Sequence, residues 1–487
     1  MAQLTIVGLG PGSLAQLTQE AWTVLTQAGE VWCRTLHHPV ISELPTGPAL
    51  HSFDFLYEKA ETFEEVYAAI VVHVLELARR EEGVIYAVPG HPLVGEAAVP
   101  RLLAAAREAG LPVRVVHGLS FIEPLLTALE VDALDGVQIA DALDVTALHH
   151  PPFNPDLPLL LGQVYSRAVA SDLKLVLMNQ YPDEHRVALV RAAGTPQEQV
   201  LWLPLFEIDR HPADPLTSLY VPALPSVSGF EGFQETIAHL RAPEGCPWDR
   251  KQTHTSLRNN LLEEAYEVLA ALDAEDVDAL REELGDLLLQ IVLHAQIATE
   301  GGEFQMTDVV SGIDAKIKHR HPHVWGGLKV SDSEEVSTNW EAIKREERVA
   351  NGQAERSLLD GVPKTLPALA QASAYASRVK RVGFDWPSIA GVVDKVQEEF
   401  AELQAAESAA ERSAEVGDVL FAVANWARWL EIDPETALRE ANARFARRFH
   451  YIEMTALQRG VALQTLGPEE MDRLWEEAKA KEDPKGR

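Results

Sequence analysis

Up to about residue 225, short apolar runs end in Gly or Pro, and stretches with apolar residues every three to four positions follow them. The first strand-like runs are Leu4–Leu9, Gly83–Val88 and Val113–Val116, and the turns after them are Gly10-Pro11-Gly12, Pro89-Gly90-His91-Pro92 and Gly118. Such runs, alternating with helical periodicity, predict an α/β domain. A second set predicts that this half has two small α/β lobes, with strands at Leu159–Leu161, Leu173–Leu177 and Val200–Leu203.

The segment His211–Ser228 contains four prolines and few helical repeats, so it is predicted to be a linker. From Phe230 onward strand signals nearly vanish, and 3.6-period segments rich in Ala, Glu and Leu take over. We therefore expect an α/β domain at 1–225 followed by an all-α half. The all-α half is expected to consist of two modules, at 226–352 and 353–487.

The all-α half repeats itself in three blocks that occur in the same order and at similar spacing. Glu263-Glu264-Ala265-Tyr266-Glu267 matches Glu398-Glu399-Phe400-Ala401-Glu402. Glu283-Leu284-Gly285-Asp286 matches Glu415-Val416-Gly417-Asp418. Asp314-Ala315-Lys316 with Arg320 matches Asn442-Ala443-Arg444 with Arg448. This order and spacing indicate a duplicated helical module.

Paired carboxylates are the main candidate for chemistry. Glu264 and Glu267 stand three apart on one predicted helix, as do Glu283 and Asp286 on the next, so each pair shares a helix face. The turn-forming run Asp273–Asp276 between them predicts an antiparallel hairpin with both pairs at the same height. The second module repeats this arrangement around Ser408–Glu411, with the acids Glu399, Glu402, Glu415 and Asp418.

The simpler alternative is that these acids form solvated helix faces, since 74 of the 487 residues are acidic. We favour a functional role because the helices have an apolar neighbouring face, which we expect to be a core stripe: Leu261, Leu262, Leu284, Leu287, Leu288, Val419 and Leu420. Acids that flank a core stripe at matched height, twice over, are not typical of a plain surface.

Four facing carboxylates would repel one another, and divalent cations are the usual remedy. Oxygen ligands favour Mg²⁺, with Mn²⁺ as the alternative, over Zn²⁺. We therefore expect a metal-activated water to attack a phosphoanhydride. Gly285 and Gly417 each precede the Asp of their module, and we expect them to allow the facing helix to approach closely.

Basic residues at repeated spacing suit a triphosphate. Lys316 and Arg320 are four apart on a helix, as are Arg444 and Arg448, so each pair presents two cations on one face. The alternative for each pair is an ordinary helix-surface charge paired with nearby acids. His319, His321 and His323 lack the spacing of a zinc site.

The formal net charge of −32 argues against a protein that coats nucleic acid or binds anionic membranes. The excess is spread evenly, with −15 in residues 1–225 and −17 in 226–487, so it is mostly a matter of solubility. Cys33 and Cys246 form neither a disulfide framework nor a CxxC pair. No basic leader or membrane-spanning run is evident, so we expect a cytoplasmic protein.

The all-α half resembles the MazG family of nucleoside triphosphate pyrophosphohydrolases over about residues 230–480. Besides the acid pairs, the resemblance rests on Gly245-Cys246-Pro247-Trp248-Asp249, Arg320-His321-Pro322-His323-Val324, Trp340-Glu341 with Lys344 and Glu347-Arg348, and Gly383-Phe384-Asp385-Trp386. It implies that the eight acids are metal ligands and that the phosphate contacts include Asn442, Arg444 and Arg448. The resemblance also implies hydrolysis of NTP or dNTP to monophosphate and pyrophosphate with Mg²⁺, in a homodimer.

The first half resembles the tetrapyrrole (corrin/porphyrin) methylases, whose two lobes bind S-adenosylmethionine. Gly8-Leu9-Gly10-Pro11-Gly12 matches the opening loop of that family, and Pro89-Gly90-His91-Pro92 lies where active members carry Gly-Asp-Pro. The resemblance implies cofactor contacts at Gly8, Gly10, Gly12, Gly90 and His91. Ser13 and His91 depart from the family's acidic residues. The combination of the two halves resembles YabN-like fusion proteins.

The function predicted from the sequence is Mg²⁺-dependent pyrophosphohydrolysis of nucleoside triphosphates, with Glu264 and Glu399 as the catalytic carboxylates. Lys316, Arg320, Asn442, Arg444 and Arg448 are the predicted substrate-binding residues. Two alternatives concern the first half, which could transfer methyl groups from S-adenosylmethionine or act as a silent ligand sensor.

Overall fold

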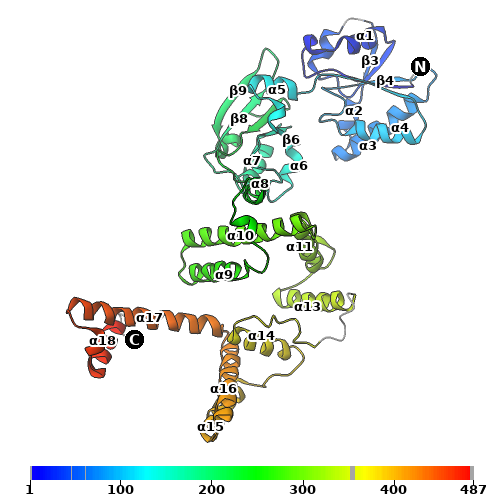
Figure 1. Ribbon diagram of the computed structural model, residues 1–487. Coiled ribbons are helices and arrows are strands. Elements are labelled where there is room, and N and C mark those ends of the chain that lie inside the picture. Colours follow the sequence, from blue (N-terminus) through cyan, green and yellow to red (C-terminus); the bar gives the residue numbers. More distant parts are fainter. Residues whose placement is uncertain (1–2, 45–46, 61, 351–356, 483–487) are drawn as a thin grey trace. The chain divides into compact units, whose positions relative to one another are not determined.

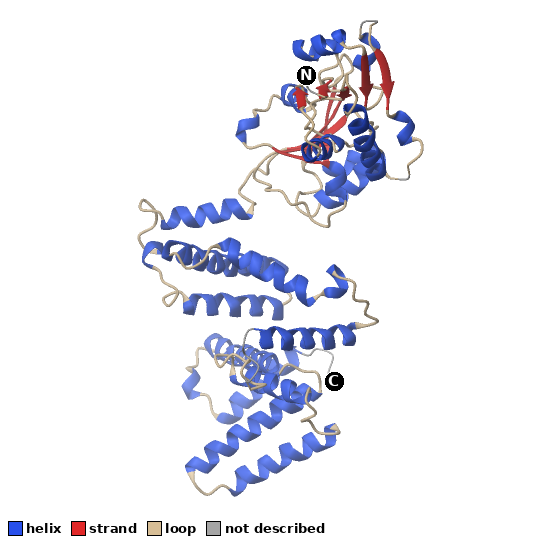
Figure 2. Cartoon of the chain, turned by 90° about the vertical axis from the view of Figure 1, so that its right-hand side faces the viewer, coloured by secondary structure: helices blue, strands red, loops and turns tan. Residues whose placement is uncertain are grey.

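The computed structural model describes residues 3–44, 47–60, 62–350 and 357–482. The chain divides into two compact units, Met1–Lys251 and Gln252–Arg487. All described strands belong to the first unit, and the regular structure of the described part of the second unit is helical (Figures 1 and 2). The predicted fold classes, α/β followed by all-α, are therefore confirmed.

The first lobe of unit one is a parallel five-stranded sheet with strand order β3-β2-β4-β1-β5. Aliphatic side chains alternate along its central strands, and α3 and α4 bury one face against Leu4, Ile6 and Tyr86. The strands are β1 (Leu4–Gly8), β2 (Glu30–Cys33), β3 (Ala49–Ser52), β4 (Val84–Val88) and β5 (Val113–Val116). The helices are α1 (Gln19–Gln27), α2 (Asp54–Tyr57), α3 (Phe63–Ala78) and α4 (Ala98–Glu108), with short turns η1 (Leu14–Gln16) and η2 (Pro39–Glu43). The next helix, α5 (Ile122–Leu129), packs instead on the second lobe, where Leu125 shares a buried cluster with Leu160 and Tyr220.

The second lobe is a mixed five-stranded sheet with strand order β6-β7-β10-β8-β9. β6 and β7 are parallel, and β10 pairs antiparallel with both β7 and β8. The strands are β6 (Gln138–Asp141), β7 (Leu159–Gly162), β8 (Arg186–Arg191), β9 (Gln199–Pro204) and β10 (Thr217–Val221). The remaining elements are α6 (Ala142–Thr146), α7 (Arg167–Leu177), η3 (Ala133–Asp135) and η4 (Leu205–Arg210).

Two predictions for this lobe are wrong. Leu173–Leu177 is the last part of helix α7, which Ser166 caps by accepting a hydrogen bond from the Val169 amide. The predicted linker His211–Ser228 contains β10, a central strand in which every residue is buried. The prolines on both sides of this strand make the segment look like a linker in sequence. They lie outside Thr217–Val221, so they remove no backbone donor from its hydrogen bonds to the neighbouring strands.

The described helices after β10 are α8 (Phe230–Arg241), α9 (Arg258–Asp273), α10 (Val277–Gly301), α11 (Met306–Arg320), α12 (Pro322–Trp325), α13 (Ser333–Ala350), α14 (Ala368–Lys380), α15 (Ile389–Ala405), α16 (Ala409–Trp429), α17 (Pro434–Gln458) and α18 (Pro468–Glu482), with turns η5 (Asp249–Lys251) and η6 (Leu463–Thr465). By its contacts α8 belongs to the first unit. Among the described residues, no helix combines the length and the apolar character needed to cross a bilayer.

Each half of the second unit contains a helical hairpin, α9 with α10 and α15 with α16 (Figure 1). Asp276 caps α10 by accepting from the amides of Asp278 and Ala279, so the predicted first turn is confirmed. Ser408 and Glu411 form a capping box at the start of α16. The second turn therefore lies just before Ser408, and Ser408–Glu411 opens the helix.

Candidate metal centres

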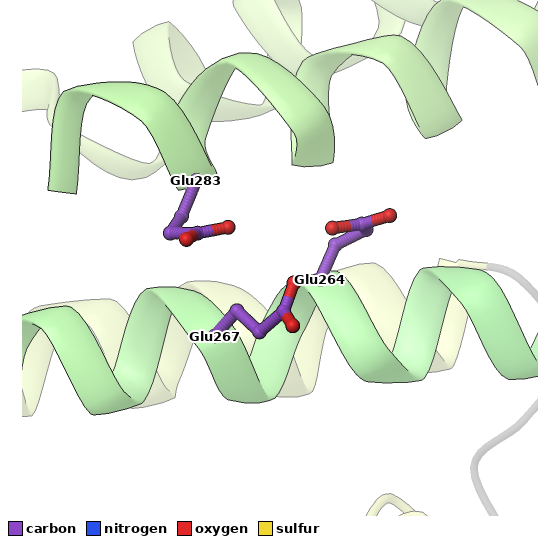
Figure 3. Close-up of side chains that lie close together, drawn as sticks. All are labelled: Glu264, Glu267 and Glu283. Atoms are coloured by element: carbon purple, nitrogen blue, oxygen red, sulfur yellow. The ribbon is translucent and has the colours of Figure 1, made fainter. Parts of the chain in front are cut away.

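The α9–α10 hairpin brings together Glu264, Glu267 and Glu283. Figure 3 shows Glu264 and Glu267 on one helix and Glu283 on the helix that faces it. One carboxylate oxygen from each residue lies within 4.8 Å of the others. Glu264 and Glu283 are half-buried, whereas Glu267 is exposed. This geometry follows from spacing of three along α9 and from the short turn that aligns the two helices.

The electrostatics of this cluster fit a site for a cation. The pKa of Glu264 is raised by partial burial, by hydrogen bonding to Glu267 and by the charge of Asp286. The pKa of Glu283 is raised by desolvation and by the charges of Glu267 and Asp286. The fourth predicted acid, Asp286, is thus close enough to act on both neighbours. Accumulated negative charge that raises these pKa values is what a divalent cation would relieve.

The α15–α16 hairpin builds the second cluster from Glu399, Glu402 and Glu415, again with ligand oxygens within 4.8 Å of one another. Glu399 is 7% exposed. Oε2 of Glu415 is buried and has no hydrogen-bond partner among the described residues. Desolvation and the charges of Glu402 and Asp418 raise the pKa of Glu415. An orphaned buried carboxylate oxygen beside further acids fits a Mg²⁺ ligand set.

The second cluster differs from the first in having a lysine on it. Nζ of Lys395 lies 2.8 Å from Oε1 of Glu399 and 2.9 Å from Oε1 of Glu398. Sequence analysis missed this residue, although its position four before Glu399 on one helix is the spacing of an ion pair. The first module has Asn260 at the equivalent position.

Two expectations about the surroundings of the acids are wrong for the single chain. An added Cβ at Gly285 or Gly417 would meet nothing within 4 Å, so neither glycine is needed for close helix approach. The expected core stripe is largely exposed: Leu262, Leu284, Leu288 and Leu420 are 37–55% accessible, and only Val419 of the stripe is buried. The apolar face beside the acids is therefore open.

The predicted phosphate-binding residues make other contacts. Arg320 forms a bidentate pair with Glu347, with distances of 3.2 Å and 2.6 Å. Arg444 pairs with Glu440 at 3.4 Å, and Arg448 lies over the Trp475 ring at 5.7 Å. Lys316 and Asn442 are exposed. The side chains of Glu341 and Arg348, quoted above for the resemblance, lie outside the described part of α13.

In the first lobe, the predicted cofactor loop is held by close backbone contacts. Gly10 and Gly90 exchange amide-to-carbonyl hydrogen bonds of 3.2 Å and 2.9 Å, and both have positive φ. A Cβ at Gly8 would lie 2.6 Å from the Gly90 carbonyl oxygen and 2.7 Å from the Gly118 nitrogen. Gly12 also has positive φ. These glycines are explained by the joining of strand ends, and binding of S-adenosylmethionine stays a prediction.

His91 lies at the same strand ends and stacks on His117, with ring centroids 5.5 Å apart. Nδ1 of His91 accepts from the Leu93 amide at 3.1 Å, so its proton is on Nε2 and is donated to His117 Nδ1 at 3.2 Å. Burial, followed by the neighbouring His117, lowers the pKa of His91. A neutral imidazole therefore occupies the position at which the methylases carry a carboxylate.

Two family models match the chain. The model of the MazG nucleotide pyrophosphohydrolase domain matches residues 252–325, and the model of the tetrapyrrole (corrin/porphyrin) methylases matches residues 3–209. A crystal structure of uroporphyrin-III-C-methyltransferase from Thermus thermophilus is 26% identical and covers 45% of this chain and 92% of its own, with a TM-score of 0.36.

Three relatives are similar to the whole chain or to its helical half. The uncharacterized protein YabN of Bacillus subtilis is 43% identical over 495 residues, which is 99% of each chain. The nucleoside triphosphate pyrophosphohydrolase/pyrophosphatase MazG of Thermotoga maritima is 43% identical over 51% of this chain and 95% of its own. The nucleoside triphosphate pyrophosphohydrolase of Escherichia coli is 44% identical over 50% of this chain and 95% of its own.

Proposed function

Because the chain belongs to the YabN-like family, in which a tetrapyrrole methylase domain is fused to a MazG pyrophosphohydrolase domain, we propose that it hydrolyses nucleoside triphosphates to monophosphate and pyrophosphate with Mg²⁺. The observation that carries the proposal is the pair of carboxylate clusters on two equivalent helical hairpins. We propose domains at residues 1–225, 226–352 and 353–487, with the hydrolase chemistry in the last two; α8 lies in the second range by sequence, although it packs with the first unit.

In each module, two acids from the first helix and two from the second would hold Mg²⁺: Glu264, Glu267, Glu283 and Asp286 in the first, and Glu399, Glu402, Glu415 and Asp418 in the second. Bound Mg²⁺ supplies positive charge against the phosphates and makes water more acidic. Glu264 and Glu399 are the least exposed acids of their first helices, and we propose them as the catalytic carboxylates of the two modules.

The substrate's negative charge needs cations, and Lys316, Arg320, Asn442, Arg444 and Arg448 are proposed to contact it. The contacts of Arg444 and Arg448 given above are with α17 and α18, so we further propose that a second copy of the chain completes the site. The open apolar face supports this homodimer, since Leu284 and Leu420 are each 50% exposed beside the acids.

The test is pyrophosphate release from a panel of NTPs and dNTPs. Glu264→Gln and Glu399→Gln should each abolish one site, and the double variant should lose about a hundredfold or more of the activity. Asp394→Asn is the matched control, because Asp394 is an exposed acid on α15 outside the cluster. Full activity in the double variant would show that these carboxylates do not hold the reacting centre.

A further inference from the structure

A pocket of about 160 Å³ opens beside the second carboxylate cluster. One end is formed by Glu399 and Asp418, which are proposed Mg²⁺ ligands, and by Lys395, which pairs with Glu399. The other end is formed by Trp386, Phe421 and Asn425. A nucleotide whose phosphates lie at the acidic end would place its base at the other end of this pocket. The inference therefore rests on the proposed function and concerns the base, which is the part that differs between nucleotides.

Aromatic side chains at this end suit a flat ring. Trp386 is 38% exposed and Phe421 is 46% exposed, so both offer accessible ring surface. The indole is fixed by the start of α15, because a Cβ on Gly391 would lie 2.7 Å from its Cδ1. Stacking on aromatic side chains is tolerant of the base, because every nucleobase has a π face. These two residues therefore supply affinity without selecting a particular base.

Asn425 is the polar group of the same end, and it is 3% exposed. Nε of Arg428 donates to an atom of the Asn425 amide at 2.8 Å. Because a guanidinium can only donate, that atom is the amide oxygen, and the amino group is the part left for the pocket. No hydrogen bond joins this amino group to another residue in the described ranges. The amino group of this largely buried side chain, which lines the pocket, is therefore available to an acceptor on a ligand.

Arg428, which holds the Asn425 amide, is itself held in place by Asp385. The guanidinium of Arg428 donates to both oxygens of Asp385, at 2.8 Å and 2.9 Å, and the indole of Trp429 donates to Oδ1 at 3.1 Å. The side chains of Arg428 and Asp385 are 11% and 12% exposed. Burial alone would raise the pKa of Asp385, but the hydrogen bonds from Trp429 and Arg428 lower it, so the pair stays charged. Arg428 and Asp385 thus act as positioning residues.

The first module has the same set of acids but lacks the aromatic and amide side chains that line this pocket in the second module. Counting from Glu283 and Glu415, Phe421 corresponds to Leu289, Asn425 to Leu293 and Arg428 to Gln296. Leu293 is 3% exposed, so an apolar side chain occupies the place of the amide. Apart from Lys395, which replaces Asn260 beside the acids, the differences between the modules described here lie at the end of the site that would meet the base.

We propose that the pocket of the second module is a nucleobase subsite, in which Trp386 and Phe421 contact the ring and the Asn425 amino group donates to a carbonyl oxygen of the base. Bases with an oxo group at C4 of a pyrimidine or C6 of a purine, namely uracil, thymine and guanine, are preferred there over cytosine and adenine, which carry an amino group at that position and would turn it toward the Asn425 donor. The first module has no such preference.

The experiment uses the full chain with Glu264→Gln, so that only the second module turns over. Values of kcat/KM for UTP, GTP, CTP and ATP are measured from pyrophosphate release. Asn425→Asp replaces the donor by an acceptor of the same shape and should lower the ratio of UTP to CTP and of GTP to ATP about tenfold. Arg428→Gln should lower the same ratios through KM with kcat retained, because it acts only on the orientation of Asn425.

The matched control is Leu293→Asn with Glu399→Gln, in which only the first module turns over. Its low selectivity should not change, because the first module lacks the counterparts of Arg428 and Asp385 that would orient the new amide. Unchanged ratios in Asn425→Asp, at intact overall turnover, would overturn the subsite. If that variant does not fold, Phe421→Leu provides a second test: weaker binding of uridine, followed by tryptophan fluorescence, supports the pocket, and unchanged binding overturns it. Failure of both the wild type and this parent to hydrolyse any of the four nucleotides would instead refute the proposed function.

Discussion

Lys395 occupies carboxylate oxygens that the second cluster would offer to Mg²⁺. Its Nζ is 2.8 Å from Oε1 of Glu399, a side chain that is 9% exposed. An ammonium held on this oxygen competes with a metal for it, whereas the first module, with Asn260 in the equivalent place, has no such competitor. Replacement of Lys395 by Asn should therefore strengthen binding of Mg²⁺ to the second module in the absence of nucleotide.

The size of the effect follows from the exposure of the pair. Hydrogen bonds to Glu399 and Glu398 raise the pKa of Lys395, so the ion pair is favourable. Because the lysine side chain is 35% exposed, solvent screens the pair, and we assign it about 1 kcal/mol. A free energy of about 1.4 kcal/mol corresponds to a tenfold change in affinity, so metal binding should tighten about fivefold.

The assay is calorimetric titration of Mg²⁺ into the full chain with Glu264→Gln, which removes one ligand of the first cluster. The reciprocal control is Asn260→Lys with Glu399→Gln, which should weaken binding at the first cluster by a similar factor. If Lys395→Asn binds Mg²⁺ equally well or more weakly while melting at the same temperature, Lys395 does not compete with the metal.

Two further predictions concern stability. The pKa of Glu283 is raised by desolvation and by its acidic neighbours, so the stability that this group contributes is present at low pH and is lost as the pH rises through its folded-state pKa. Glu283→Gln should therefore have a higher melting temperature than the wild type at pH 8 in EDTA. This difference should shrink below pH 4 and disappear with saturating Mg²⁺. Gly118→Ala would place a Cβ 2.4 Å from a carbonyl oxygen and should lower the melting temperature by several degrees, whereas Gly29→Ala, with nothing within 4 Å, should leave it nearly unchanged in the same calorimetric scan.

Local patterns were sufficient to predict most of the elements named from the sequence, and they failed where tertiary context decides. Val113–Val116 is a strand as predicted, because a β-branched run between turn residues has few other options. Leu173–Leu177 is also apolar but has only one β-branched residue, Val176, and the cap at Ser166 begins a helix that continues through it. Thr217–Val221 was missed because its ladder partners β7 and β8 are distant in sequence.

The carboxylate clusters could be predicted because they depend on helix periodicity and on one short turn, both of which are local. The contacts of the cations could not. Arg320 pairs with Glu347, a residue 27 positions away on another helix, and no spacing rule indicates that choice. The same holds for Asn425, whose amide orientation is defined only once Arg428 and Asp385 are in place.

The distribution of differences between the two modules limits where selectivity can reside. A triphosphate is the same in every nucleotide, so the acids that would hold its metal can be duplicated without change, as Glu264 and Glu399 are. Selectivity is a difference of affinities, and it requires a group that interacts unequally with different bases. Leu293 lacks such a group, whereas Asn425 has a fixed donor. If both modules hydrolyse nucleotides, the first should therefore accept them broadly and the second should determine the preference of the whole chain.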